Sequence, residues 1–124
     1  MGRLIPKSSD YYLFLMPMQF KRIRIPSSFV KNDDVKWVLR DIINDFQFEE
    51  KQAIYYSCAS DATIEDVAKK IELSQNHVSS VLTLYLERLM CKIDFFKKII
   101  PYDESDTLSI SELLFLEPAN SNDI

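Results

Sequence analysis

Hydrophobic residues recur at helical spacing through the middle of the chain, and the pattern is clearest between Thr63 and Leu89. Apolar positions three and four residues apart indicate two helices that bury one face each in a shared core. These positions are Val67 and Ile71 in the first segment and Val78, Val81 and Leu82 in the second. Ala68 is small enough for a close helix crossing, and Leu73 is expected to fill the turn. Residues 63–89 therefore predict a helix-turn-helix.

Capping residues stand where this prediction requires helix ends. Thr63 with Asp66 forms a capping box for the first helix, and Ser74 can cap the second. Glu72 occupies a turn position that most often holds glycine, because its expected left-handed conformation costs a residue with a Cβ atom about 1 kcal/mol. An ordinary helical hairpin is the alternative interpretation.

The segments before the motif predict a helical scaffold. Asp33 or Asp34 can cap a helix that runs to about Phe46. Its buried side is expected to contain Val35, Val38, Leu39, Ile42, Ile43 and Phe46. Trp37 lies off this stripe and is expected to pack on the N-terminal segment. A further helix is predicted from about Phe48 to Ala59.

The two ends of the chain have different patterns. Lys21 to Ile25 alternates charged and apolar residues before Pro26, which predicts a strand or extended arm that pairs with a second chain or lies along DNA. Ser109 with Glu112 forms a capping box for a short helix over residues 110–117, and residues 119–124 are expected to be disordered. We therefore predict a mainly α-helical fold with an N-terminal extended arm (1–30), a small helical helix-turn-helix domain (31–102) and an acidic C-terminal tail with a short helix (103–124).

The second motif helix is predicted to continue to about Lys98, because its apolar stripe persists until Pro101 forbids further helix. A second apolar row lies about 100° or more away around the helix. This row contains Leu84, Cys91 and Phe95. One core cannot cover both rows. Either the helix bends near Met90, or the second row binds a partner, and a homodimer or higher oligomer is expected.

Composition limits the organisation of the chain. With 124 residues, 47% of them hydrophobic, the chain can bury one core. The net charge of −4 is unevenly distributed: residues 1–40 carry eight Lys/Arg against three Asp/Glu, and residues 103–124 carry no Lys/Arg against six Asp/Glu. A basic beginning and an acidic end indicate that affinity for phosphate lies outside the motif.

Sequence signatures of catalysis are missing from the chain. It has no glycine-rich phosphate loop, and its single histidine, His77, excludes paired histidine ligands. We therefore expect no enzyme activity, cofactor, metal or small-molecule substrate. Two cysteines, Cys58 and Cys91, do not indicate a disulfide framework. The apolar run at residues 11–18 is too short to span a membrane. A cytoplasmic protein without a membrane partner or export signal is expected.

The second motif helix carries no charged residue from Gln75 to Leu86. Glutamine and asparagine can form two hydrogen bonds with adenine, and serine and threonine are adaptable donors and acceptors. The predicted base-reading residues are Ser74, Gln75, Asn76, Ser79, Ser80 and Thr83. Phosphate contacts are expected from Lys69, Lys70, Arg22 and Arg24. Double-stranded DNA is therefore the predicted partner.

The order of these parts resembles the PapB-type family of bacterial fimbrial (adhesin) operon regulators. The resemblance covers about residues 48–105, with FEEKQAIYYSCA, the motif core DVAKKIELSQNHVSSVL and a trailing PYDES. It implies a helical, cytoplasmic, self-associating transcription regulator that binds AT-rich DNA near fimbrial promoters. Leu84 and Glu87 stand where that family tends to place arginine. The motif also resembles that of AraC-type regulators, although no second such motif follows.

The sequence thus favours a bacterial DNA-binding transcription regulator that controls fimbrial, adhesin or virulence gene expression. The arginines of the arm and the polar face of the second motif helix support this hypothesis. The alternative is a protein-interaction module that has lost DNA binding and docks on another regulator or on RNA polymerase. The uncharged recognition helix and the acidic tail favour the alternative.

Overall fold

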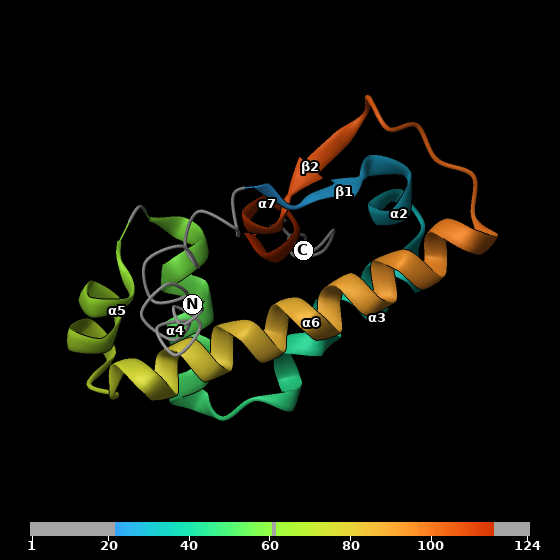
Figure 1. The fold of residues 1–124 in the computed structure, drawn as a ribbon. Coiled ribbons are helices and arrows are strands. Elements are labelled where there is room, and N and C mark those ends of the chain that lie inside the picture. The colour runs from blue at the N-terminus through green and yellow to red at the C-terminus, as the bar shows by residue number, and fades with distance from the viewer. Residues whose placement is uncertain (1–21, 61, 116–124) are drawn as a thin grey trace, which may run out of the picture.

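One long helix, α6 (Gln75–Ile99), extends along the whole molecule, and the other elements pack on it. The computed structural model describes residues 22–60 and 62–115 (Figure 1). Helices α3 (Asp33–Asp41), α4 (Phe48–Ala59) and α5 (Ile64–Ile71) contact α6, as does the 3₁₀ turn η2 (Ile42–Asp45). The predicted mainly α-helical fold is confirmed.

A small antiparallel sheet joins the two ends of the described chain. Strand β1 (Arg24–Pro26) pairs with β2 (Thr107–Ser109), and Ile25 lies opposite Leu108. Ile25 is fully buried, as is Phe29 in the short helix α2 (Ser27–Lys31) that follows. The extended segment predicted here thus pairs within its own chain, and part of the predicted arm lies in the core. Residues 1–21 lie outside the described part of the chain, so the predicted packing of Trp37 on the N-terminal segment stays a prediction. The Trp37 side chain is 60% exposed.

The first scaffold helix differs from its prediction in three details. Its cap is Asn32, whose side-chain oxygen accepts from the backbone N–H groups of Asp34 and Val35, so the assignment of Asp33 or Asp34 as the cap is wrong. The helix tightens into η2 at residue 42, before Phe46. Val38 is 39% exposed and not buried as predicted, because it lies about 60° from Val35 at the edge of the apolar stripe. The other predicted stripe residues are buried.

The predicted helix-turn-helix geometry is present in α5 and α6. Thr63 Oγ1 accepts from the backbone N–H of Asp66 (3.1 Å), and the Asp66 carboxylate accepts from the backbone N–H of Thr63 (3.2 Å). The backbone N–H groups of Glu72 and Leu73 both donate to the carbonyl of buried Ala68 (2.8 and 3.0 Å). Glu72 is left-handed with φ of 67°, as predicted for this turn. These bonds set the angle at which α6 leaves the turn.

Helix α6 is continuous from Gln75 to Ile99, so the alternative of a bend near Met90 is wrong. Its core-facing residues Val78, Leu82, Tyr85, Leu89 and Ile93 are almost fully buried. The second row stays outside this core: Leu84 is 41% exposed, Phe95 is 54% exposed, and Cys91 is also exposed.

The short C-terminal helix α7 (Ile110–Phe115) starts with the predicted capping box. Ser109 Oγ accepts from the backbone N–H of Glu112 (3.1 Å), and the Glu112 carboxylate accepts from the N–H of Ser109 (2.8 Å). Leu113 and Leu114 are buried, and α7 packs against α4. The predicted continuation to residue 117 and the predicted disorder of residues 119–124 lie outside the described part of the chain.

Replacing Glu72 with glycine is expected to raise the free energy of unfolding by about 1 kcal/mol, because glycine adopts the left-handed conformation without a Cβ penalty. Urea denaturation measures the difference. Glu65→Gly, at an exposed position in the first turn of α5, is the matched control and should lower the free energy of unfolding, because glycine is a poor helix former. A Glu72→Gly protein no more stable than the parent would contradict the assigned strain.

Candidate nucleic-acid interface

The predicted base-reading residues lie on the first three turns of α6. Gln75, Asn76 and Ser80 are exposed, and Ser79 and Thr83 are half-buried. Their spacing of one, three and four residues brings them onto one side of the helix, away from the core-facing residues. The structure therefore groups five of the six predicted residues into one uncharged polar face, named here the α6 polar face: Gln75, Asn76, Ser79, Ser80 and Thr83.

The sixth residue, Ser74, has a structural role in the described geometry. Its hydroxyl accepts from the backbone N–H of His77 at 3.0 Å and so caps α6, as predicted. The first turn of α6 contains no acidic residue. The partial positive charge of the helix N-terminus is therefore not offset by carboxylates within that turn.

A side-chain hydrogen bond that sequence reasoning missed links the start of α6 to α4. His77 Nε2 lies 2.8 Å from Glu50 Oε2, and the other oxygen of Glu50 accepts from the backbone N–H of Gln47 at 2.9 Å. The hydrogen bond from Gln47, followed by that from His77, lowers the pKa of Glu50 below its ordinary value. Glu50 and His77 are 27 residues apart, so no local pattern indicates the contact.

Two of the predicted cations lie on the first helix of the motif. Lys69 and Lys70 are exposed in the last turn of α5. The Lys69 ammonium is 3.7 Å from the Glu65 carboxylate, and the Lys70 ammonium is 5.7 Å from the centre of the Tyr56 ring. Both lysines keep exposed side chains, and exposed ion pairs such as that of Lys69 are weak. They can therefore turn toward a phosphate.

The structure does not bring Arg24 to the α6 polar face. Its guanidinium donates to the hydroxyl (3.1 Å) and the carbonyl (3.2 Å) of Thr107 across the small sheet. Figure 1 shows this sheet well apart from α5 and the start of α6. Arg22 is exposed at the beginning of the described chain. The predicted role of both arginines in DNA contact stays a prediction.

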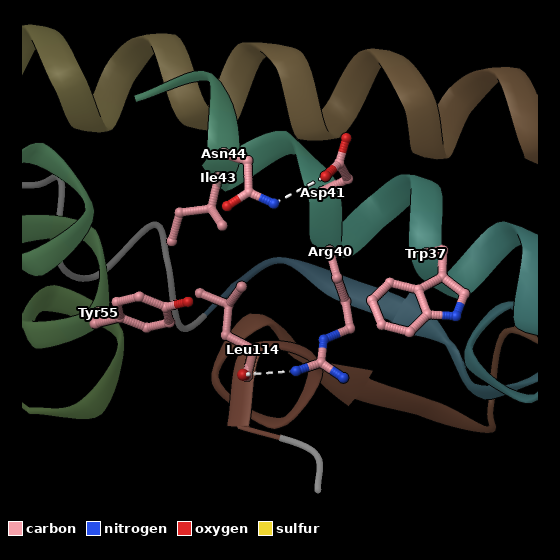
Figure 2. A pocket seen from close by; sticks show the side chains of 7 residues that line it. All are labelled: Trp37, Arg40, Asp41, Ile43, Asn44, Tyr55 and Leu114. Carbon is pink, nitrogen blue, oxygen red and sulfur yellow. Dashed lines mark hydrogen bonds between the residues drawn. The ribbon is translucent and has the colours of Figure 1, made fainter. Parts of the chain in front are cut away.

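A pocket of about 130 Å³ lies between α3, α4 and α7 (Figure 2). Arg40 donates to the Leu114 carbonyl at 3.4 Å, and its guanidinium lies 6.0 Å from the Trp37 ring. Asn44 donates to the Asp41 carboxylate at 2.8 Å. Arg40 thus bonds to the end of α7, and Asn44 and Asp41 bond to each other. We therefore interpret the pocket as part of the contact between α7 and α3.

Groups with catalytic or ligand chemistry do not gather elsewhere. Burial raises the pKa of the Cys58 thiol, and Cys91 lies exposed on another helix. Within residues 22–60 and 62–115, no cluster of three or more His, Cys, Asp or Glu side chains could hold a metal ion. None of the helices described here is long and apolar enough to cross a membrane.

Comparison with known proteins gives no relative. No protein-family model, curated protein or solved structure matches this chain. The resemblance to PapB-type regulators therefore stays a prediction. The case for a function depends on the geometry of α5 and α6.

Glu50→Gln is expected to make stability less dependent on pH. Because the pKa of Glu50 is lowered in the folded state, its contribution to stability is fully present above the ordinary pKa of a glutamate and is lost as pH falls through the lowered folded-state pKa. The parent should be more stable than the variant at about pH 7, and this advantage should shrink as the pH is lowered through the acid range. Urea denaturation across this range gives both values.

Glu49→Gln is the matched control, because it removes a neighbouring exposed carboxylate without the two partners of Glu50. If the advantage of the parent over Glu50→Gln were the same at both ends of the pH range, the hydrogen bonds assigned to the Glu50 carboxylate would be absent in solution.

Proposed function

We propose that this protein is a bacterial transcription regulator that binds double-stranded DNA through its helix-turn-helix, residues 63–89. The observation that carries the proposal is the α6 polar face, which stands exposed at the start of a helix fixed to α5 by a tight turn. In this type of motif, the second helix enters the major groove with its N-terminal residues toward the bases. Asn76 and Ser80 occupy that position.

The chemistry of the α6 polar face supports recognition of A·T pairs. Gln75 and Asn76 can each form two hydrogen bonds with adenine N6 and N7, and the Thr83 methyl can contact the thymine methyl group. No side chain on this face is a lysine or arginine, which are the usual partners of guanine. AT-rich operators are therefore the favoured target.

Phosphate contacts in this proposal come from few groups. Lys69 and Lys70 lie on the first motif helix, and the N-terminus of α6 offers backbone N–H groups, although the Glu50 carboxylate beside His77 offsets part of the positive charge there. The guanidinium of Arg88 donates to the Asp45 carboxylate at 2.6 Å, so Arg88 is not counted among the phosphate contacts. Two neutralised phosphates would give a slope of log affinity against log salt of about −1.8 per motif, which is shallow for a specific regulator.

The remaining parts of the proposal follow the resemblance. Control of fimbrial, adhesin or virulence genes and action in the cytoplasm are the setting that the resemblance to PapB-type regulators implies. A homodimer or higher oligomer would raise affinity by placing more than one motif on DNA. The expectation of no enzyme activity or cofactor belongs to the same proposal.

The second candidate function is a protein-interaction module that docks on another regulator or on RNA polymerase. The observation that favours it is the near balance of charge around the motif. Residues 62–89 contain four Asp/Glu and three Lys/Arg, namely Glu65, Asp66, Glu72 and Glu87 against Lys69, Lys70 and Arg88. A nearly neutral surface attracts a polyanion weakly. Fluorescence anisotropy with a labelled AT-rich duplex separates the two candidates.

Asn76→Ala and Ser80→Ala are each expected to weaken binding to an AT-rich operator by about 1–3 kcal/mol, because each removes a hydrogen bond to a base edge. Both side chains are exposed, so circular dichroism should show an unchanged fold. Ser28→Ala, at an exposed position in α2, is the matched control and should bind like the parent. Parent-like binding by both α6 variants would mean that another surface reads the bases.

Lys69→Ala combined with Lys70→Ala is expected to flatten the salt dependence of binding. Each lost phosphate contact lowers the slope of log affinity against log salt by about 0.9, so the double change should remove about 1.8 per motif. Anisotropy titrations at several salt concentrations give the slope. A parent protein that binds neither AT-rich nor GC-rich duplex at low salt would instead support the interaction module.

A further inference from the structure

Helix α6 has three faces, and the described core and the α6 polar face account for two of them. With about 100° of rotation per residue, the row of Leu84, Cys91 and Phe95 lies about 110° from the centre of the α6 polar face. The core-facing residues lie on the third side. The row is therefore available to a partner that leaves both the core and the α6 polar face undisturbed. All three of its side chains are exposed.

A groove of about 270 Å³ runs beside this row, between α6 and η2. Its α6 side includes Leu84, Cys91 and Lys92, and Asp45 stands on the η2 side. Arg88 crosses the groove and donates to the Asp45 carboxylate at 2.6 Å, which ties η2 to α6. This bond links the two sides of the groove within one chain.

Charged residues flank the row with opposite signs on its two sides. Helical rotation places Glu87 and Asp94 toward the α6 polar face and Arg88 and Lys92 toward η2, and Glu87 also lines the groove. In a heptad repeat lettered a to g, positions a and d face the partner helix and positions e and g flank them. If Leu84 and Cys91 are assigned to d, then Phe95 falls at a, Glu87 at g and Lys92 at e. These are the positions that select the orientation of two paired helices.

We propose that two copies of this chain pair in parallel through this row of α6, with Glu87 of each copy facing Lys92 of the other. In a parallel pair, a g residue meets the e residue five positions later on the partner, so both Glu87–Lys92 contacts are attractive. An antiparallel pair would bring acidic flanks together and basic flanks together. Like charges at such contacts oppose association, so the charge pattern selects the parallel arrangement.

The apolar contacts and the groove fit this arrangement. Leu84 and Phe95 meet their own counterparts along the two-fold axis, and Cys91 faces Cys91 of the second copy. Arg88 falls at a position near the axis, where two arginines would repel, but its bond to Asp45 draws the guanidinium aside. The Glu87 flank of the second copy would then lie along Lys92, on the α6 side of the groove.

The consequence for DNA rests on the proposed function. A two-fold axis parallel to α6 reverses every direction perpendicular to that helix, so the two α6 polar faces point to opposite sides of the dimer. One straight duplex cannot lie against both faces. The dimer would therefore hold two duplex segments, or two parts of one bent duplex.

The test measures the oligomeric state without DNA, so its failure is distinguishable from failure of DNA binding. Glu87→Lys and Lys92→Glu should each raise the dimer dissociation constant about tenfold in sedimentation equilibrium, because each turns two attractive contacts into repulsive ones. The double variant with both changes should regain the parent constant. Mixing the two single variants should give a heterodimer, since all its facing charges are opposite.

The matched control is Glu65→Lys, the same charge reversal on exposed α5, which should leave the dissociation constant unchanged. Leu84→Glu with Phe95→Glu should give a monomer, and circular dichroism should show that it is folded. A parent that is monomeric at every concentration, or single charge variants that dimerise like the parent, would overturn the proposal. The second result would indicate an antiparallel pair or another surface.

Cross-linking reports the orientation directly. Diamide, which accepts the two protons and two electrons of a thiol pair, should join Cys91 to Cys91 of the second copy in a disulfide that dithiothreitol reverses. Cys58→Ser should cross-link like the parent, because Cys58 is half-buried on α4. Cys91→Ser and Glu87→Lys should both lose the covalent dimer at low protein concentration. A covalent dimer that persists in Glu87→Lys would overturn the parallel register.

Discussion

Burial of one side of α6 is the constraint on which the structure depends. Tyr85, Leu89 and Ile93 are almost fully buried along the middle of a 25-residue helix, and α3, η2, α4 and α5 all contact that helix. The elements that contact α6 cover this one side, and residues on its other sides, such as Asn76 and Leu84, are exposed. Its other sides therefore stay in solvent, and their chemistry is what the protein presents to partners.

Two side-chain contacts determine which residues the exposed sides of α6 present. The pair of His77 with Glu50 ties the first turn of α6 to α4, and the pair of Arg88 with Asp45 ties its middle to η2. Together with the bonds to the Ala68 carbonyl, they resist rotation of α6 about its own axis. Exposed ion pairs contribute little to the free energy of unfolding, so their main effect is geometric. The α6 polar face and the apolar row are held in fixed directions.

The two ends of the described chain are joined on the other side of the core. Strands β1 and β2 pair, and the guanidinium of Arg24 bonds to Thr107 across them. Arg40 similarly bonds to the end of α7. Both arginines thus support the fold, whereas Lys69 and Lys70 stand exposed in the last turn of α5, next to the turn that leads into α6. This distribution explains why the proposed DNA contact relies on neutral hydrogen-bonding groups.

The sequence by itself determined most of the longer helices and several of their ends, because capping boxes and apolar repeats act between residues three or four apart, but it missed the Asn32 cap and the 3₁₀ turn that ends α3. The boxes at Thr63 and Ser109, the left-handed Glu72 and the length of α6 were all predictable on that basis. Tertiary structure alone decided the contacts between distant segments, such as Glu50 with His77, Asp45 with Arg88 and Arg24 with Thr107, which are 27, 43 and 83 residues apart. It also placed α2 in the core and left Val38 exposed. Those outcomes depend on how whole elements dock, and no local pattern encodes the docking.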